Sequence, residues 1–302
     1  MSVKVDHLTK LYGEQKAVND ISFEVHSGEI LGFLGPNGAG KSTTMKIITT
    51  FIPQTSGNVT VSGFDVIDQS AEVRKRIGYL PENNPLYLDM YIKECLEFFA
   101  DLHGIQNKKA RVDEMIEVTG LTRESKKKNG TLSKGYRQRV GLAQALIHNP
   151  EVLIMDEPTS GLDPNQVVEI RNLIKKIGKQ KTVILSTHIL QEVQALCDRV
   201  IIINKGQLVA NDTIDNLQKS SSGETALTVE FKETIERAQL QKIRTVKQVD
   251  NIDGNKWRLI SDKDMQEDVF QFAVSNHLTI LSLEKEKQSL EDIFRTLTNS
   301  SK

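Results

Sequence analysis

The sequence lacks an excess of charge of either sign. Its 302 residues include 39 lysine and arginine residues against 40 aspartate and glutamate residues, which gives a formal net charge of −1. Such a chain has no overall positive field that would attract nucleic acid or anionic lipid. We therefore expect no nucleic-acid partner, and any anion must be recognised at a local site.

Cysteine and long apolar runs are also scarce. Cys95 and Cys197 lie far apart within apolar helical patterns and lack the spacing of metal ligands. We expect both to be buried, reduced thiols of a cytosolic protein. No stretch approaches the ~18 apolar residues of a membrane span, and the first residues lack the apolar run of a signal peptide. A cytoplasmic chain is expected, which reaches the inner face of the cell membrane only through another protein.

Short β-branched runs alternate with longer helical patterns along most of the chain. The runs are GEILGFLG, EVLIMDE, TVILSTH and RVIIINKG. This alternation is typical of an α/β fold in which a largely parallel sheet is covered on both faces. The opening segments alternate with period two, as an antiparallel β flap would, and residues 86–148 are predicted to be a helical subdomain. We assign residues 1–218 to this domain.

The composition then changes to serine and glycine, which marks a linker at residues 219–225. Residues 226–302 follow the order strand, helix, strand, strand, helix, strand, with a hairpin at Asp253-Gly254. This order predicts a small α+β domain of the ferredoxin-like type. Residues 234–243 are expected to form its first helix, and Ser289 and Asp292 are expected to cap the last.

A glycine-rich loop follows the first buried strand and fits the pattern G-x-x-x-x-G-K-[ST]. Its glycines let successive N–H groups point at phosphate oxygens, and the next helix adds its positive N-terminal end. Lys41 would span the β- and γ-phosphates, while the Ser42 hydroxyl would bind Mg²⁺. The predicted nucleotide site contains Gly35, Pro36, Asn37, Gly38, Ala39, Gly40, Lys41, Ser42 and Thr43.

Two adjacent carboxylates end the buried strand of VLIMDE. Asp156 can hold Mg²⁺, and Glu157 can accept a proton from an attacking water. His188 ends another strand at the same carboxyl edge, where ligands of α/β sheets bind. We predict Glu157, His188 and Lys41 as the catalytic residues, with an acidic surface turn as the alternative for the carboxylates. Tyr12 is expected either to stack on adenine or to pack in the core.

The segment LSKGYRQRV opens a helix that we expect to run to Asn149. Ser133 can cap this helix, and its hydroxyl, the Gly135 N–H and the helix dipole can together hold an anion. The phosphate loop lies far from this segment in the sequence. The segment is therefore either a simple capped helix or one half of a site that a second copy completes.

Taken in order, GPNGAGKST, YLPE, LSKGYRQRV, LIMDEPTSGLD and STH resemble the motifs of ATP-binding subunits of ATP-binding cassette (ABC) transporters, over residues 3–217. The resemblance implies an ATPase with a P-loop ABC-type nucleotide-binding domain, which uses ATP and Mg²⁺ and dimerises head to tail. Asp163 would lie at the dimer seam. A signature segment in one copy would clamp the ATP held at Lys41 of the other; its residues are Leu132, Ser133, Lys134, Gly135 and Tyr136.

Two departures from the family pattern suggest a subclass. Lys134 and Tyr136 replace the third and fifth residues of the usual Leu-Ser-Gly-Gly-Gln signature, and Glu82 replaces a glutamine that contacts magnesium. These variants resemble the ATPases of ABC-2 type exporters, which pair with a separate polytopic permease. The C-terminal domain is similar to that of drug-export members. LTKLYG and GEQKAVNDISF are similar to the ATPase of the bacteroidete gliding-motility exporter.

The main hypothesis is an exporter motor whose second ATPase subunit is an identical copy. Two other functions compete with it. A soluble ABC-type ATPase that acts on the ribosome or DNA would usually carry two cassettes or a long coiled-coil insertion, and this sequence has neither. A regulatory module that binds ATP without hydrolysing it is disfavoured by the presence of Glu157 and His188.

Overall fold

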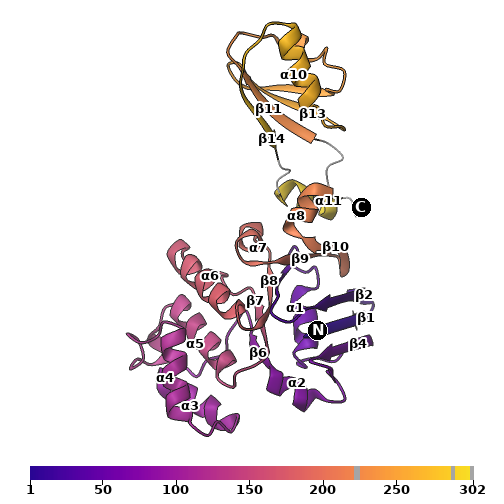
Figure 1. Ribbon diagram of the computed structural model, residues 1–302. Coiled ribbons are helices and arrows are strands. Elements are labelled where there is room, and N and C mark those ends of the chain that lie inside the picture. Colours follow the sequence, from indigo (N-terminus) through magenta and orange to yellow (C-terminus); the bar gives the residue numbers. More distant parts are fainter. Residues whose placement is uncertain (221–224, 287–289, 300–302) are drawn as a thin grey trace. The chain divides into compact units, whose positions relative to one another are not determined.

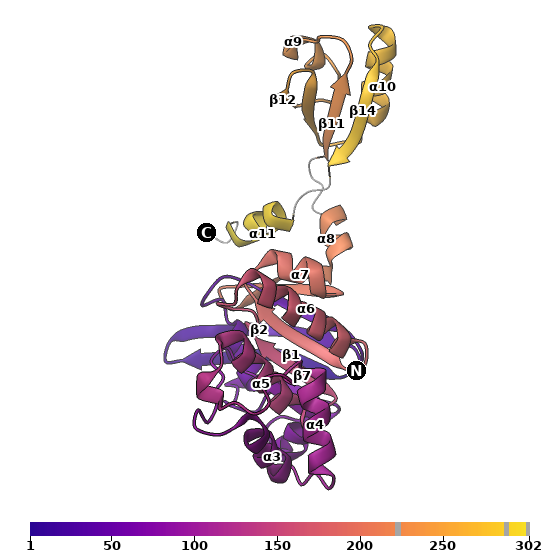
Figure 2. The same ribbon diagram turned by 90° about the vertical axis from the view of Figure 1, so that its left-hand side faces the viewer.

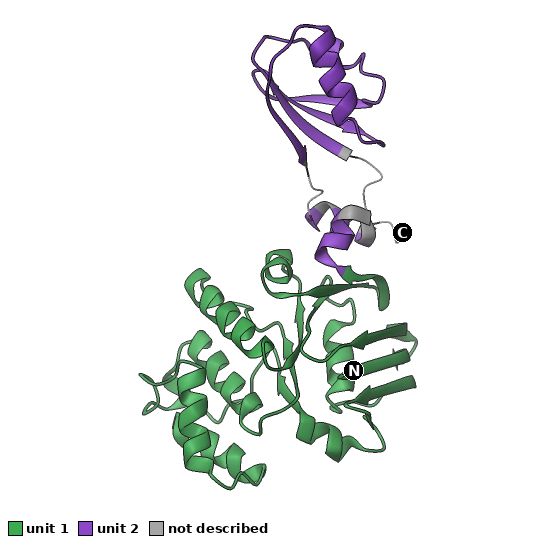
Figure 3. Cartoon of the chain, in the orientation of Figure 1, with its two compact units in different colours: residues 1–212 green, residues 213–302 purple. Residues whose placement is uncertain are grey.

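The structure is a computed structural model that describes residues 1–220, 225–286 and 290–299. The chain forms two compact units, residues 1–212 and 213–302 (Figure 3). The sequence places the division after residue 218, whereas in the structure it falls before helix α8 (Ile214–Ser220). Part of the predicted linker lies outside the described residues.

A six-stranded sheet forms the centre of the first unit, in the order β10-β9-β3-β8-β7-β6. The pairs β3·β8, β3·β9, β7·β8 and β6·β7 are all parallel, as the alternating pattern predicts. The strands are β3 (Ile30–Leu34), β6 (Ile77–Leu80), β7 (Val152–Asp156), β8 (Thr182–Thr187), β9 (Arg199–Asn204) and β10 (Gln207–Thr213).

This sheet is buried on both faces. Alternate residues of β7 join different cores: Val152 and Ile154 pack with the flap and α1, while Leu153 and Met155 pack with the helical subdomain. Burial of such side chains stabilises the fold by about 1.5–3 kcal/mol each. The helices around the sheet, visible in Figure 1, are α1 (Lys41–Ile48), α2 (Ser70–Arg76), α6 (Pro164–Gly178) and α7 (Leu190–Leu196).

The predicted antiparallel flap is present as a second sheet in the order β2-β1-β4-β5. Val3 pairs with Val25 on one side and with Val61 on the other, both antiparallel. Val3 and Val5 show the period-two burial that the sequence predicts, and a register shift before Leu8 moves the next buried residue by one position. Its strands are β1 (Val3–Tyr12), β2 (Gln15–Val25), β4 (Ser56–Val61) and β5 (Phe64–Asp65).

The helical subdomain lies at one end of the first unit in both views (Figures 1 and 2). It contains α3 (Ile92–Leu102), α4 (Lys108–Val118), the 3₁₀ helix η1 (Asn129–Thr131) and α5 (Lys134–Leu146). The prediction that α5 runs to Asn149 is wrong: the helix ends at Leu146, because Asn149 has a positive φ of 55°. Cys95 is buried in α3, and Cys197 is partly buried after α7; both are free thiols.

The second unit contains a four-stranded sheet in the order β12-β13-β11-β14. All three strand pairs are antiparallel, and this order is that of a ferredoxin-like fold. One prediction is wrong here, because only α9 (Arg237–Leu240) of the expected helix 234–243 is helical. The other elements are β11 (Thr225–Phe231), β12 (Gln248–Asp253), β13 (Lys256–Ser261), α10 (Gln266–Ser275), β14 (Ile280–Glu286) and α11 (Leu290–Asn299).

The short α9 belongs to a segment that packs through turns. Ile235, Leu240 and Ile243 are all buried, and Ile243 N–H bonds to the Leu240 carbonyl with the spacing of a turn. Core packing therefore overrides the helical pattern there. The cap predicted at Ser289 and Asp292 lies outside the residues whose side chains are described.

Candidate nucleotide site

The strand register brings the predicted site residues to one edge of the central sheet. Leu34 lies opposite Thr187 on the neighbouring strand, and Asp156 lies opposite Ser186. The phosphate loop after β3, the acidic pair at the end of β7 and His188 after β8 are therefore adjacent, because β8 lies between β3 and β7. Carboxyl ends of parallel strands are the usual ligand sites of α/β folds.

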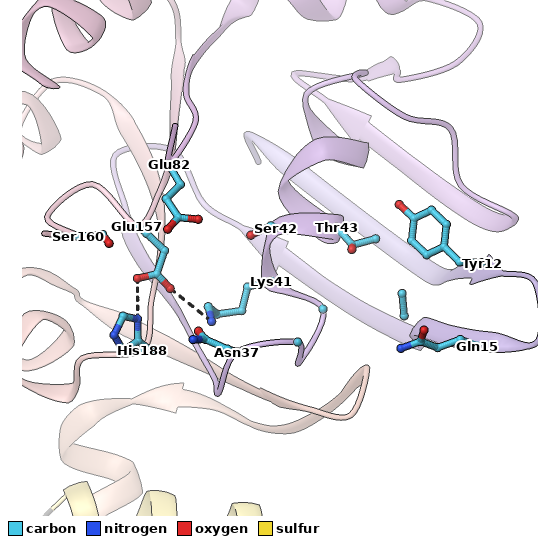
Figure 4. Close-up of a pocket in the computed structure, with 13 residues that line it drawn as sticks. Tyr12, Gln15, Asn37, Lys41, Ser42, Thr43, Glu82, Glu157, Ser160 and His188 are labelled. Carbon is cyan, nitrogen blue, oxygen red and sulfur yellow. Dashed lines mark hydrogen bonds and ion pairs between the residues drawn. The ribbon is translucent and has the colours of Figure 1, made fainter. Parts of the chain in front are cut away.

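A cleft of about 530 Å³ opens at this edge (Figure 4). Ten of the predicted residues line it: Tyr12, Asn37, Gly38, Gly40, Lys41, Ser42, Thr43, Glu82, Glu157 and His188. Glu157 and His188 lie at one end, and Tyr12 lies at the flap end. Three further residues line the cleft that their sequence positions did not predict: Gln15, Ala17 and Ser160.

The phosphate loop depends on glycine at its turn into α1. Gly40 has φ 108° and precedes the first residue of the helix. A Cβ at this position would lie 2.5 Å from the Ala17 carbonyl oxygen, so no larger residue fits. Gly35 and Ala39 of the predicted loop are buried behind the cleft lining, whereas Pro36 is exposed and does not line the cleft. Helix α1 presents its free N–H groups at its beginning.

Opposite charges are buried together in the cleft. The side chains of Lys41 and Glu157 are 5% and 9% exposed, and their Nζ and Oε1 atoms lie 3.4 Å apart. Lys41 Nζ also donates to the carbonyl oxygens of Gly35 and Pro36, at 2.8 and 3.2 Å. The second carboxylate oxygen of Glu157 lies 2.7 Å from His188 Nδ1. Each buried charge is thus paired, which keeps the desolvation cost low.

The donor set beside Lys41 fits a small, hard cation. Ser42 Oγ donates to Asp156 Oδ1 at 3.0 Å, and Glu82 lines the same cleft. Among the described residues, no three His, Cys, Asp or Glu side chains cluster as a full metal site. A hydroxyl and one or two carboxylates with substrate oxygens are the ligands that Mg²⁺ prefers. Asp156 also raises the pKa of Tyr79 by its charge, after the larger effect of burial.

Tyr12 does not pack in the core. Its residue is 51% exposed, and Lys10 Nζ lies 5.3 Å from the centre of its ring. Because the ring lines the flap end of the cleft, its face is available to a flat heterocycle. The position excludes the core alternative.

Comparison with known proteins gives the family. A family model described as "ABC transporter" matches residues 18–160, and "ATP-binding protein DrrA1-3-like, C-terminal domain" matches residues 213–298. The linearmycin resistance ATP-binding protein LnrL of Bacillus subtilis is 34% identical, covering 98% of this chain and 98% of its own length. The bacitracin transport ATP-binding protein BcrA of Bacillus licheniformis is 37% identical, covering 97% and 95%. The chain belongs to the ABC transporter ATP-binding proteins.

Solved structures agree with this family. The dimeric, post-hydrolysis structure of the ATP-binding cassette MJ0796 with ADP and Pi matches with a TM-score of 0.64 and 28% identity. The match covers 70% of this ABC ATP-binding protein and 98% of that chain. The chain is therefore an ATPase. Neither relative above is named for gliding motility, so that resemblance stays a prediction.

The signature segment lies apart from the cleft of its own chain. None of its predicted residues is among the described residues that line the cleft. Ser133 is exposed and caps α5, since its Oγ accepts from the Tyr136 N–H at 3.4 Å. Asp163 caps α6 by accepting from the Gln166 N–H at 3.0 Å. Gln166 Nε2 also donates to Ser133 Oγ at 3.4 Å, so the two capped helix ends are neighbours.

Proposed function

We propose that this ABC ATP-binding protein is the motor subunit of an ABC-2 type exporter. Two copies close head to tail around two ATP molecules and drive a separate polytopic permease from the cytoplasmic face of the membrane. The observation that carries this proposal is the separation of a complete cleft around Lys41 from an exposed half-site at Ser133. A half-site with no phosphate loop gains a use only when a second copy brings one.

The cleft suggests how hydrolysis proceeds. The phosphates of ATP bind the N-terminus of α1 and Lys41, which leaves Glu157 free to accept a proton from the attacking water. His188 holds the other carboxylate oxygen and orients it. Ser42, Asp156 and Glu82 are the residues that would hold Mg²⁺, which neutralises phosphate charge when bound. The ring of Tyr12 stacks on adenine.

Closure of the dimer completes each site. The Ser133 hydroxyl and the Gly135 N–H of one copy contact the γ-phosphate on the other, helped by the dipole of α5. Leu132, which is buried, anchors the segment from below. The substitutions at Lys134 and Tyr136 leave this arrangement intact, because neither stands at a signature position that contacts the anion. Asp163 lies at the seam and links the two sites.

The permease contact is placed on the helical subdomain. Its described surface exposes large apolar side chains, and the rings of Tyr87 and Phe98 pack edge to face at 5.8 Å. Exposed apolar groups that gather in this way mark protein interfaces. The set consists of Tyr87, Leu88, Tyr91, Phe98 and Leu102. No helix in the described ranges is long and apolar enough to cross a membrane.

Similarity over nearly the whole chain to a bacitracin transport protein and a linearmycin resistance protein favours an exporter over a ribosome-acting ATPase. To test this, tagged Glu157→Gln protein is expressed in its native cells and the membranes are solubilised gently with ATP and Mg²⁺. Mass spectrometry then identifies the near-stoichiometric partners. A polytopic membrane protein is the expected result, and ribosomal proteins or nucleic acid in its place would overturn the exporter proposal.

A further inference from the structure

A carboxylate outside the cleft is buried more deeply than either of those inside it. Glu192, on α7, is 1% exposed and does not line the cleft. Its Oε1 accepts a hydrogen bond from Thr159 Oγ1, and its Oε2 accepts one from Thr187 Oγ1 at 2.7 Å. Arg171 Nη2 on α6 lies 3.9 Å from Oε1 and supplies opposite charge. A carboxylate is kept in such a place only where partners of this kind compensate its burial.

The two threonines sit next to the residues assigned to hydrolysis. Thr159 follows Glu157 by two positions, and Thr187 directly precedes His188. Thr187 Oγ1 also accepts from the Ile189 N–H at 3.0 Å, so it fixes the backbone on both sides of His188. Both threonines are buried, which protects their bonds to Glu192 from water. One side chain therefore joins the loop after β7 to the loop after β8.

We propose that Glu192 is a positioning residue for ATP hydrolysis. Its carboxylate clamps the two loops together and so maintains the 2.7 Å contact between His188 Nδ1 and Glu157. The inference rests on the proposed roles of Glu157 and His188. Loss of the carboxylate releases both loops at once, and small displacements of reacting groups are costly in rate. Binding of ATP at Lys41 does not use the clamp, so the effect falls on kcat.

Steady-state ATPase kinetics of the full chain test the clamp. Glu192→Ala is expected to lower kcat about 10- to 100-fold, with the KM for ATP within about twofold of wild type. Glu192→Gln keeps one acceptor oxygen and should lose less. A folded Glu192→Ala variant with wild-type kcat would overturn the proposal. A wild-type chain without ATPase activity would instead contradict the proposed function. Failure of the clamp and failure of the proposed function are therefore distinguishable.

A second set of variants removes one bond at a time and covers the case in which Glu192→Ala does not fold. Thr159→Val is isosteric but lacks the hydroxyl, and it should lower kcat by about tenfold. Thr159→Ser keeps the hydroxyl and should restore most of the rate. Thr119→Val is the matched control, because the buried Thr119 hydroxyl bonds to the Met115 carbonyl within the helical subdomain. Equal kcat for the two valine variants would contradict the clamp.

Dimerisation separates chemistry from assembly. In the Glu157→Gln background, Glu192→Ala should still form ATP-dependent dimers in size-exclusion chromatography, because the clamp contacts neither Lys41 nor Ser133. Loss of the dimer would show that Glu192 acts on assembly, and the proposed role in positioning would then be wrong.

Discussion

Helices α1 and α5 both begin with backbone N–H groups that can bind an anion, yet their surroundings differ. The start of α1 lies in a cleft with a buried ion pair between Lys41 and Glu157. The start of α5 has the exposed Ser133, whose hydroxyl caps its own helix and accepts a hydrogen bond from Gln166 Nε2. Both ends therefore favour an anion, and only the first has a buried lysine–carboxylate pair beside it.

This difference shows why a helix terminus alone does not define a site. At α1, Lys41 is paired with Glu157, the proposed proton acceptor, which directly follows β7. At α5, the side chain that donates to Ser133 is the neutral Gln166, and the lysine at the helix start, Lys134, is exposed. The second terminus can strengthen the hold on a phosphate but cannot activate water. The proposed division of labour between two copies rests on this contrast.

The largest expected effect comes from the cleft at the start of α1. Glu157→Gln removes the proton acceptor but keeps the shape, so turnover should fall by about 10²- to 10⁴-fold. Binding of ATP, measured by equilibrium dialysis, should persist because Lys41 remains. Glu151→Gln, at an exposed carboxylate just before β7, is the control and should hydrolyse ATP normally. Undiminished turnover in Glu157→Gln would show that another group takes the proton.

The next largest effect is expected at Ser133, at the exposed start of α5. Ser133→Asp keeps a good helix cap and suits the dipole of α5, so the melting temperature should be unchanged or slightly raised. The added charge should repel the partner's γ-phosphate and lower the ATPase rate by about tenfold or more. ATP binding by the monomer should be normal, since Ser133 does not line the cleft.

Mixing two impaired variants tests whether each ATP site is formed by residues of two copies. Alone, Ser133→Asp and Lys41→Met should each have at most about a tenth of the wild-type ATPase rate. In a mixed dimer, one site combines the intact Lys41 of the first copy with the intact Ser133 of the second. ATPase activity should therefore reappear on mixing, as a coupled phosphate-release assay would detect. If it does not, the two helix ends do not meet across a dimer.

A smaller effect is expected from the metal side of the cleft. Glu82→Gln restores the amide that is usual in the family and removes one negative charge near Ser42 and Asp156. Because two oxygen ligands remain, the ATPase rate should change by less than about tenfold. A titration of rate against Mg²⁺ measures any change in coupling. Complete loss of hydrolysis would assign Glu82 a further role.

The last prediction concerns the other end of α5 and affects folding stability rather than the ATPase rate. Burial, with the charge of His103 next, lowers the pKa of His148 to about 4. An unfolded histidine has a pKa of about 6.5, so the unfolded chain takes up the proton first as pH falls. Stability from neutral His148 is complete above about pH 6.5 and is lost as the pH falls towards 4.

Thermal unfolding between pH 7 and pH 4 measures this loss. The wild-type chain should lose at most ~3 kcal/mol of folding free energy through His148. His148→Gln should lose less over the same range, although His103, stacked on His148 at 4.1 Å, also has a pKa lowered by burial. Equal losses in the two proteins would show that other groups cause the acid sensitivity.

The sequence predicts those parts of the cleft that consecutive residues carry. The phosphate loop, Asp156, Glu157 and His188 each follow an apolar strand, and parallel strands bring their carboxyl ends to one edge. The flap, the helical subdomain and the ferredoxin-like order are predictable for the same reason, since each has its own periodicity.

Contacts between distant segments escape such reasoning. Glu192 and Thr159 are 33 residues apart and meet only because β7 and β8 are neighbours. Gln15 and Ala17 reach the cleft through the fold of the flap, and their only sequence signal is proximity to Tyr12. The early end of α5 depends on one backbone angle at Asn149, which a helical pattern does not reveal.

The backbone of Glu157 has a positive φ of 50°, which a residue with a side chain adopts at a cost of about 1 kcal/mol or more. Glycine would relieve that strain. Because glycine also leaves the buried Lys41 without its paired carboxylate, we expect Glu157→Gly to lose both turnover and resistance to heat. A search for heat-stable variants should therefore retain this carboxylate even when it ignores activity, because its pairing with the buried Lys41 outweighs the strain of its backbone.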